Sequence, residues 1–313
     1  MYLESRCYNS GIFLCVHITF RRRFNVTPLS CSWPHLRAMS LKSLLSEITT
    51  GIWMMETPNV SAYKEIIAGL RSGSFQKEEA QMFHQVMGDV AMNPQNKQPE
   101  LINKVAVIDF EGELTKYTGM CNIGADTLIA KTLEYNRDPS VKAFIFRMDG
   151  PGGNAAVIPM FYELKEKLTK PVIAFVEKAC SLHYYAAAIL AEHIMMANDF
   201  TAEAGSIGAM IMFEKPDKEL IMIRPPQSND KNQELIEALE GNYELLEKRL
   251  IPLAERFMAD VKASRPQVKD EVLHGKVVYA KDAIKMGLAD SIGNIEMAYK
   301  LAIARAELNN KTK

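Results

Sequence analysis

Between residues 104 and 198, short apolar runs alternate with longer amphipathic segments, and this alternation limits the fold more than any other feature of the chain. Four runs have the nearly continuous apolar composition of buried strands: KVAVIDFEGEL (104–114), VKAFIFRM (141–148), PVIAFVEKA (171–179) and HIMMAN (193–198). Three segments between them have helical spacing: 124–138, 154–168 and 182–192. Strands that alternate with helices of this length predict right-handed βαβ crossovers and an α/β fold with a mostly parallel sheet.

The segment that precedes this region has a different pattern. From residue 39 onward the apolar residues recur three and four apart, as in KEEAQMFHQVM (77–87), which is typical of helices. The polar stretch NPQNKQPE (93–100) has the composition of a linker. We therefore expect a helical N-terminal segment with its linker (39–100), followed by an α/β domain (101–313).

The segment that follows the alternating region returns to helical spacing. After GSIGAMIMF (205–213) comes a polar loop, and apolar residues then recur at helical intervals from about 232 to 264. A strand-like VVYA (277–280) and two more helices complete the chain. We expect this helical C-terminal region to belong to the α/β domain.

The first 38 residues have neither pattern. Their short apolar run, GIFLCVHITF (11–20), is too short to span a membrane, and the positive cluster follows it, whereas in a signal peptide positive charge comes first. We expect residues 1–38 to be a disordered extension or a stretch that is not translated in the cell. A membrane-targeting segment is the alternative interpretation.

The bulk composition excludes several classes of protein. The 313 residues are 48% hydrophobic and 24% charged, as in ordinary soluble globular proteins, and the net charge of -1 provides no basic field for nucleic acid. The five cysteines form no Cys-x-x-Cys pair, so the sequence predicts neither a metal site nor a redox motif. We expect free thiols, a cytoplasmic location and no nucleic-acid partner.

Two strand-end turns contain the residues most suited to chemistry. DGPGG follows the strand at 141–148, and KACSLHYY follows the strand at 171–179. Ligands of open α/β sheets collect beyond the carboxyl ends of the strands. Alone, Ser181 would be a helix N-cap and the two glycines a tight turn. Together, the Gly152 and Gly153 amides could face a carbonyl attacked by Ser181, which describes an oxyanion hole.

Four motifs in order extend this pattern: DGPGGNA, KPVIAFVEKACSLHYYAAAILAEHIMMAN, AGSIGAM and HGKVVYAKDAIKMGLADSIG. They resemble the core of the protease IV (signal peptide peptidase) family of serine peptidases, over about residues 104 to 300. The resemblance implies a crotonase/ClpP-like fold of repeated ββα units. It also implies a Ser-Lys dyad that hydrolyses peptide bonds without metal or cofactor, a protein or peptide substrate and a homo-oligomer.

The family's functional positions fall on identifiable residues of this chain. Ser181 matches the nucleophile, and the lysine base is expected about fifty residues later, where Lys231 is the only lysine of its loop. A lysine acts as a base only where burial lowers its pKa toward neutrality. The resemblance places five further residues around the oxyanion and the substrate: Gly152, Gly153, Leu182, Gly205 and Ser206.

Some residues beside the serine depart from the family pattern or suggest other chemistry. Many members carry Gly-Gly after the serine, where this chain has Leu182 and His183. His183 is an alternative base. It lies only two residues from Ser181, however, which is too close in sequence for the usual geometry of a serine and its base. Cys180 is an alternative nucleophile. The competing interpretation is that Cys180 is a small buried thiol with a packing role.

The N-terminal stretch GIWMMETPNVSAYKEIIAGL (51–70) resembles the phage-type branch of the family, whose members mature capsids or are encoded beside portal proteins. We therefore expect a phage or prophage head-maturation peptidase, with capsid or portal proteins as partners and association with the virion or prohead. The alternatives are a membrane-associated signal peptide peptidase, an acyl-CoA enzyme and an inactive capsid scaffold. The presence of both Ser181 and Lys231 favours the peptidase.

Overall fold

The computed structural model describes residues 53–55, 82, 84–119, 122–211 and 223–311. All of them belong to one compact unit, residues 37–313. The predicted extension at 1–38 lies outside the described residues, as does most of the predicted helical segment that follows it.

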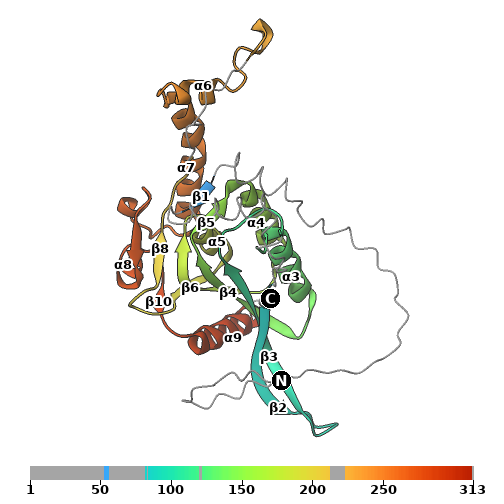
Figure 1. Cartoon of the computed structure of the whole chain (residues 1–313). Helices are drawn as coiled ribbons and strands as arrows, with labels where there is room; N and C mark the ends of the chain where they lie inside the picture. Colours follow the sequence, from blue (N-terminus) through green and yellow to red (C-terminus); the bar gives the residue numbers. More distant parts are fainter. Residues whose placement is uncertain (1–52, 56–81, 83, 120–121, 212–222, 312–313) are drawn as a thin grey trace, which may run out of the picture. The chain divides into compact units, whose positions relative to one another are not determined.

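A mostly parallel sheet forms the centre of this unit (Figure 1). Its strands are β2 (His84–Met92), β3 (Pro99–Glu111), β4 (Val141–Gly150), β6 (Val172–Cys180), β7 (His193–Met196), β8 (Glu203–Gly205), β9 (Val277–Tyr279) and β10 (Ser291–Ile292). The order is β10–β7–β6–β4–β3–β2, with β8 beside β6 and β9 beside β8. Among the described strands of this sheet, the pairs β2–β3 and β8–β9 are antiparallel and all other pairs are parallel. The predicted α/β class and parallel crossovers are confirmed.

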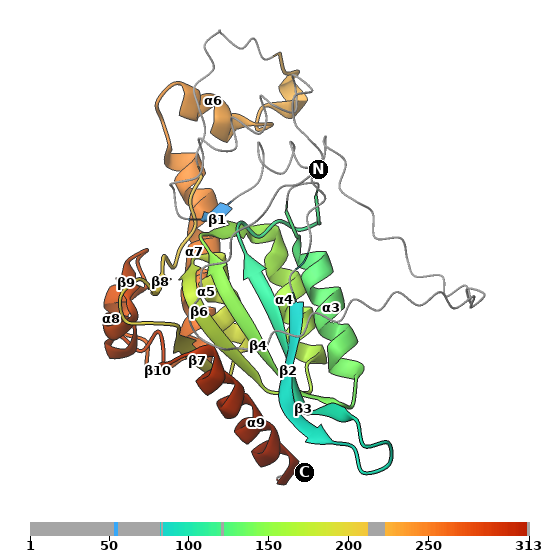
Figure 2. The ribbon, with the colours of Figure 1, turned by 60° about the horizontal axis from the view of Figure 1, so that its bottom comes forward.

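Helices cover both faces of the sheet, as Figure 2 shows. They are α3 (Ala125–Arg137), α4 (Ile158–Lys167), α5 (Leu182–Leu190), α6 (Gln233–Leu239), α7 (Glu244–Ser264), α8 (Ala280–Lys285) and α9 (Ile295–Lys311). On one face, buried residues of α3, α4, α5 and α7 join the larger hydrophobic core. On the other face, α9 buries Ala298, Ala302 and Ala306, which recur every four residues and therefore share one side of the helix.

The predicted helical segment at 39–100 is wrong where the structure describes it. His84–Met92 is strand β2, and the short strand β1 (Trp53–Met55) lies further upstream. The predicted linker at 93–100 is the turn of a hairpin and the start of β3. This segment forms a strand in spite of its helical spacing, because β3 provides backbone partners along His84–Met92, with one irregularity between Met87 and Asp89.

The predicted helical stretch at 232–264 is confirmed as two helices that meet near Gly241, whose φ is 96°. The buried residues of α7 are Phe257 and Val261, both in its C-terminal half. Phe257 packs edge-on against Tyr185 of α5, with ring centroids 5.0 Å apart. The N-terminal end of α7 leads to α6, which Figures 1 and 2 both place away from the sheet.

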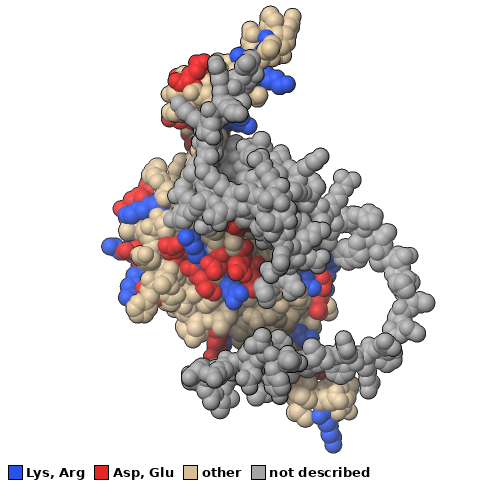
Figure 3. Space-filling view, viewed as in Figure 1, with Lys and Arg blue, Asp and Glu red and all other residues tan. Residues whose placement is uncertain are grey.

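The visible surface carries charges of both signs. In Figure 3, acidic side chains gather near the middle of the described face, and basic side chains lie beside them. None of the helices in the described ranges is both long and apolar enough to cross a membrane.

Candidate active site

Three of the sequence motifs meet at the carboxyl ends of β4, β6 and β8. Gly150 at the end of β4 is in register with Ala179 of β6, and Cys180 is in register with Gly205 of β8. The DGPGG turn, Ser181 and the Gly205–Ser206 turn therefore follow neighbouring strand ends. The structure thus brings together the residues that the sequence assigned to the nucleophile, the oxyanion turn and the GSIG turn.

Ser181 occupies the junction between β6 and α5 with an unusual backbone conformation. Its φ is 53° and its ψ is -117°, a combination that costs a non-glycine residue about 1–3 kcal/mol. The Ser181 N–H donates to the Gly205 carbonyl at 2.8 Å, and its own carbonyl accepts from the Tyr185 N–H at 2.9 Å. The side chain makes no capping hydrogen bond, so the N-cap role is not its function. A strained serine on a sharp strand-to-helix turn is the backbone arrangement of a nucleophile elbow.

The oxyanion turn is held tightly on one side. The Leu114 N–H donates to the Gly152 carbonyl at 2.9 Å, and the Asn154 N–H donates to the Leu114 carbonyl at 2.8 Å. A Cβ on Gly153 would lie 2.1 Å from the Leu114 carbonyl oxygen, so only glycine fits this position. Gly152–Asn154 form the short strand β5.

The GSIG turn supports the serine from the opposite side. Gly205 has a φ of 133°, and a Cβ there would lie 2.2 Å from the Lys276 carbonyl oxygen. The next residue, Ser206, donates its N–H to that same carbonyl at 3.0 Å and has a φ of 54°. The conformation of this turn directs the Gly205 carbonyl at the Ser181 amide.

His183 has a role that sequence reasoning missed. Its side chain is fully buried, and Nδ1 accepts the Gly152 N–H at 3.1 Å. Burial lowers the pKa of His183 to about 3, against the opposing effect of backbone hydrogen bonds at Phe110 and Gly152. The ring is therefore neutral at ordinary pH and fixes the oxyanion turn. Of the two amides predicted to form the oxyanion hole, those of Gly152 and Gly153, the Gly152 N–H is thus already bound to the His183 ring.

Leu182 and Cys180 lie on either side of the serine. Leu182 is the first residue of α5, and amides in the first turn of a helix lack intrahelical acceptors. Its amide and the positive end of the α5 dipole both lie next to Ser181. Cys180 is fully buried in β6, as the interpretation of a small buried thiol predicted.

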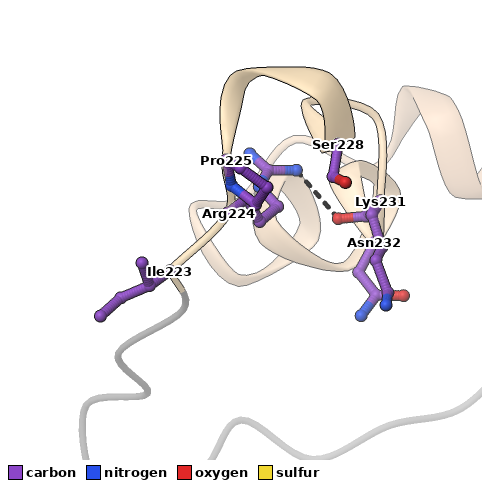
Figure 4. A pocket seen from close by; sticks show the side chains of 6 residues that line it. All are labelled: Ile223, Arg224, Pro225, Ser228, Lys231 and Asn232. Atoms are coloured by element: carbon purple, nitrogen blue, oxygen red, sulfur yellow. Dashed lines mark hydrogen bonds between the residues drawn. The ribbon is translucent and has the colours of Figure 1, made fainter.

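The structure does not bring Lys231 to Ser181. Lys231 directly precedes the N-cap of α6, its side chain is exposed, and no hydrogen bond or ion pair joins it to Ser181 in the described ranges. It lines a pocket of ≈ 230 Å³ (Figure 4). Arg224 also lines this pocket, and its guanidinium donates to the Lys231 carbonyl at 2.9 Å. The predicted dyad is not assembled in this conformation.

No protein-family model matches the chain. It is 30% identical over 227 residues to the chloroplastic serine protease SPPA of Arabidopsis thaliana, a match that covers 66% of this chain and 33% of the relative. It is 27% identical over 213 residues to Protease 4 of Haemophilus influenzae, covering 64% of this chain and 34% of the relative. The chain thus spans about a third of the length of these curated relatives. The predicted resemblance to the protease IV family is confirmed to this extent, and the phage-type branch stays a prediction.

Among solved structures, the chain is similar to a lysine-to-alanine mutant of the 1510-N membrane-bound stomatin-specific protease in complex with a substrate peptide. The TM-score is 0.41 at 17% identity, and the match covers 62% of this chain and 77% of that one.

Proposed function

We propose that the chain is a serine peptidase whose nucleophile is Ser181. One observation carries the proposal: a serine with a strained backbone at a buried strand-to-helix turn, between a glycine turn and a helix N-terminus. The curated relatives that match 66% and 64% of the chain are named as proteases, and the chain spans about a third of their length. Neither a helix cap nor a tight turn alone requires this combination of strain, burial and convergence.

In the proposed reaction, Ser181 Oγ attacks the carbonyl carbon of the substrate peptide bond while a base accepts its proton. The negative oxygen of the tetrahedral intermediate is stabilised by the Leu182 amide and by the Gly153 amide of the oxyanion turn, once strand β1, which pairs with Gly153, has moved away. The other amide of this turn, Gly152, is engaged by His183. The base then protonates the leaving amine, and water hydrolyses the acyl-serine. Each amide donor contributes roughly 3–4 kcal/mol to this step.

The proposed base is Lys231, and it requires a rearrangement. Lysine in water titrates near 10.4, roughly three units too high for a base at neutral pH. Lys231 must therefore leave solvent and approach Ser181 to within about 3 Å. Residues 223–231 of the same chain can close over the strand ends, or a second copy can present its Lys231.

A mixing experiment separates these two routes. Ser181→Ala and Lys231→Ala proteins are each expected to be inactive on a peptide substrate. Activity that appears when they are mixed identifies a lysine supplied by a second copy. A mixture as inactive as its components identifies closure within one chain.

The nucleophile is tested with an activated-serine probe such as a fluorophosphonate. We expect the probe to label the full chain at Ser181, and Ser181→Ala to abolish both labelling and peptide cleavage. Cys180→Ala is the matched control, because it changes the neighbouring residue and should keep both. Peptide cleavage by purified Ser181→Ala protein would contradict the proposal, and so would labelling confined to Cys180.

A finer proposal concerns the biological role: maturation of a phage or prophage head, with a capsid or portal protein as the substrate. It rests on the resemblance of residues 51–70 to the phage-type branch. Portal and major capsid genes beside the gene for this chain, and cleavage of that capsid protein on co-expression, would support it. Cleavage of membrane-inserted signal peptides instead would favour the signal peptide peptidase alternative.

A further inference from the structure

The strand β1 lies against the oxyanion turn. Trp53–Met55 pairs antiparallel with β5, so that Trp53 faces Asn154, Met54 faces Gly153 and Met55 faces Gly152. These two strands form a small sheet separate from the main one. A segment from far upstream in the sequence thus contacts the turn next to Ser181.

The two edges of β5 have different partners. Gly152 and Asn154 direct a carbonyl and an amide to Leu114, at 2.9 and 2.8 Å. Because successive residues of a strand direct their peptide groups to opposite edges, the Gly153 N–H and carbonyl point to the other edge. That edge is where Met54 lies. The central residue of β1 therefore occupies the backbone groups of Gly153.

The direction of β1 matches that of a chain approaching the serine. From Trp53 to Met55 the backbone passes Asn154, Gly153 and then Gly152. Gly152 is the residue fixed by His183, which lies two positions after Ser181 in α5. An extended peptide that adds to this edge in the same direction would run toward the nucleophile.

We propose that Trp53–Met55 is an internal occupant of the peptide-binding edge and inhibits the site in cis. This inference rests on the proposed function, since it assigns β5 as the edge to which a substrate peptide adds. A substrate must displace β1 before its backbone can lie along β5 and its reacting carbonyl can accept the Gly153 N–H. A tethered segment has an effective concentration on the order of mM, so a free peptide of similar intrinsic affinity competes poorly.

The choice of β1 residue makes the proposal testable by proline substitution. Met54 is the residue paired with Gly153, so Met54→Pro removes an N–H directed at β5 and disrupts the pairing. Met55→Pro is the matched control, because its N–H points away from β5 and proline is tolerated at such edge positions. Neither residue belongs to the proposed catalytic machinery.

The first measurement does not depend on activity. In a Ser181→Ala background, a fluorescein-labelled peptide of residues 51–57 (GIWMMET) is titrated against the full chain and followed by fluorescence anisotropy. We expect Met54→Pro to bind the peptide about 10-fold more tightly than its parent, and Met55→Pro to stay within about 2-fold. Equal affinity in all three proteins overturns the proposal, as does equal tightening by both prolines.

The second measurement uses the intact serine. Competition in cis raises the KM of a peptide substrate without changing kcat, so Met54→Pro should lower KM about 10-fold at constant kcat. A gain confined to kcat overturns the proposal. If no variant cleaves any peptide but the binding difference is found, the inference about β1 stands and the proposed peptidase function fails.

Discussion

Helices α5 and α6 follow the two residues of the proposed dyad, and their surroundings differ completely. Every residue of α5, which Ser181 precedes, is buried. In α6, which Lys231 precedes, only Ala238 is buried. The nucleophile is thus fixed by the core, whereas the proposed base is attached to a part of the chain with few apolar contacts.

The contacts around the two residues show the same contrast. Ser181 is held by a neighbouring strand end through the Gly205 carbonyl. Around Lys231, Arg224 bonds to residues of its own loop and to Gln233 at the start of α6. Between α6 and α7, Arg249 forms a surface ion pair with Glu234 at 2.8 Å. A surface ion pair contributes about 0–1 kcal/mol, so this pair adds little to the stability of the segment.

The largest effect is expected from substitution of Lys231, which should abolish peptidase activity and leave the folding stability unchanged. If Lys231 is the base, Lys231→Ala should lower kcat by about 10²- to 10⁴-fold, and Lys231→Arg should not restore it, because arginine stays protonated. Thermal unfolding should stay within about 1–2 °C of the parent, since the side chain is exposed. Lys248→Ala, another exposed lysine nearby, is the control and should keep full activity. Near-normal turnover by Lys231→Arg would show that another group is the base.

The second largest effect is expected at Gly205, whose carbonyl holds the Ser181 amide, and it is a loss of folding stability. Gly205→Ala combines a φ of 133° with a Cβ only 2.2 Å from the Lys276 carbonyl oxygen, so it should lower the free energy of unfolding by about 2–4 kcal/mol. Gly208→Ala is the matched control: its φ is 152° but no atom lies within 4 Å of a Cβ there. It should cost about 1 kcal/mol. Equal losses in chemical denaturation would show that the close contact is relieved without cost.

The third effect is on the pH dependence of stability. The pKa of His183 is about 3 in the folded chain and near 6.5 when unfolded, so the unfolded state binds more protons between these values. Stability should therefore fall as the pH is lowered through this window, by up to about 1.4 kcal/mol per unit from this residue. His183→Asn keeps an acceptor for the Gly152 N–H and removes the titration. Urea denaturation at pH 7 and pH 5 should show a smaller loss for the variant, and an identical loss would contradict the assignment.

The smallest effect is expected from substitution of Arg224, which holds the segment around Lys231. Arg224→Ala removes the guanidinium that joins the Lys231 carbonyl to Gln233, but its partners are exposed or half-buried. We expect a change of at most about 0.5 kcal/mol in unfolding free energy. Differential scanning calorimetry should detect almost no shift. A loss above about 2 kcal/mol would mean that this segment is held as firmly as the serine turn.

The same contrast explains what the sequence could predict. Ser181, Gly153 and Gly205 sit on turns between a strand and the element that follows, so their meeting depends on local periodicity and on the parallel order of strands. Lys231 depends on where a loop of polar composition lies, and no periodic pattern determines that. Only the type and approximate position of the base could be inferred.

Two other features were beyond sequence reasoning for different reasons. His183 departs from the Gly-Gly of the family pattern, and only the folded structure shows that its ring accepts the Gly152 N–H. A histidine two residues after a predicted nucleophile, in an otherwise apolar helix, was the available signal. The strands at 53–55 and 84–92 were missed because short apolar segments fit both helical and strand spacing, and their partners lie elsewhere in the chain.

The pairing of β1 with β5 also sets an order of events in folding. Residues 56–151 separate the two strands, so closing this loop costs entropy that local contacts do not. On the ribosome, β1 is made first but its partner does not exist until the turn at 152–154 has been synthesised. Strand β1 therefore has no partner in β5 until residues 152–154 have been synthesised.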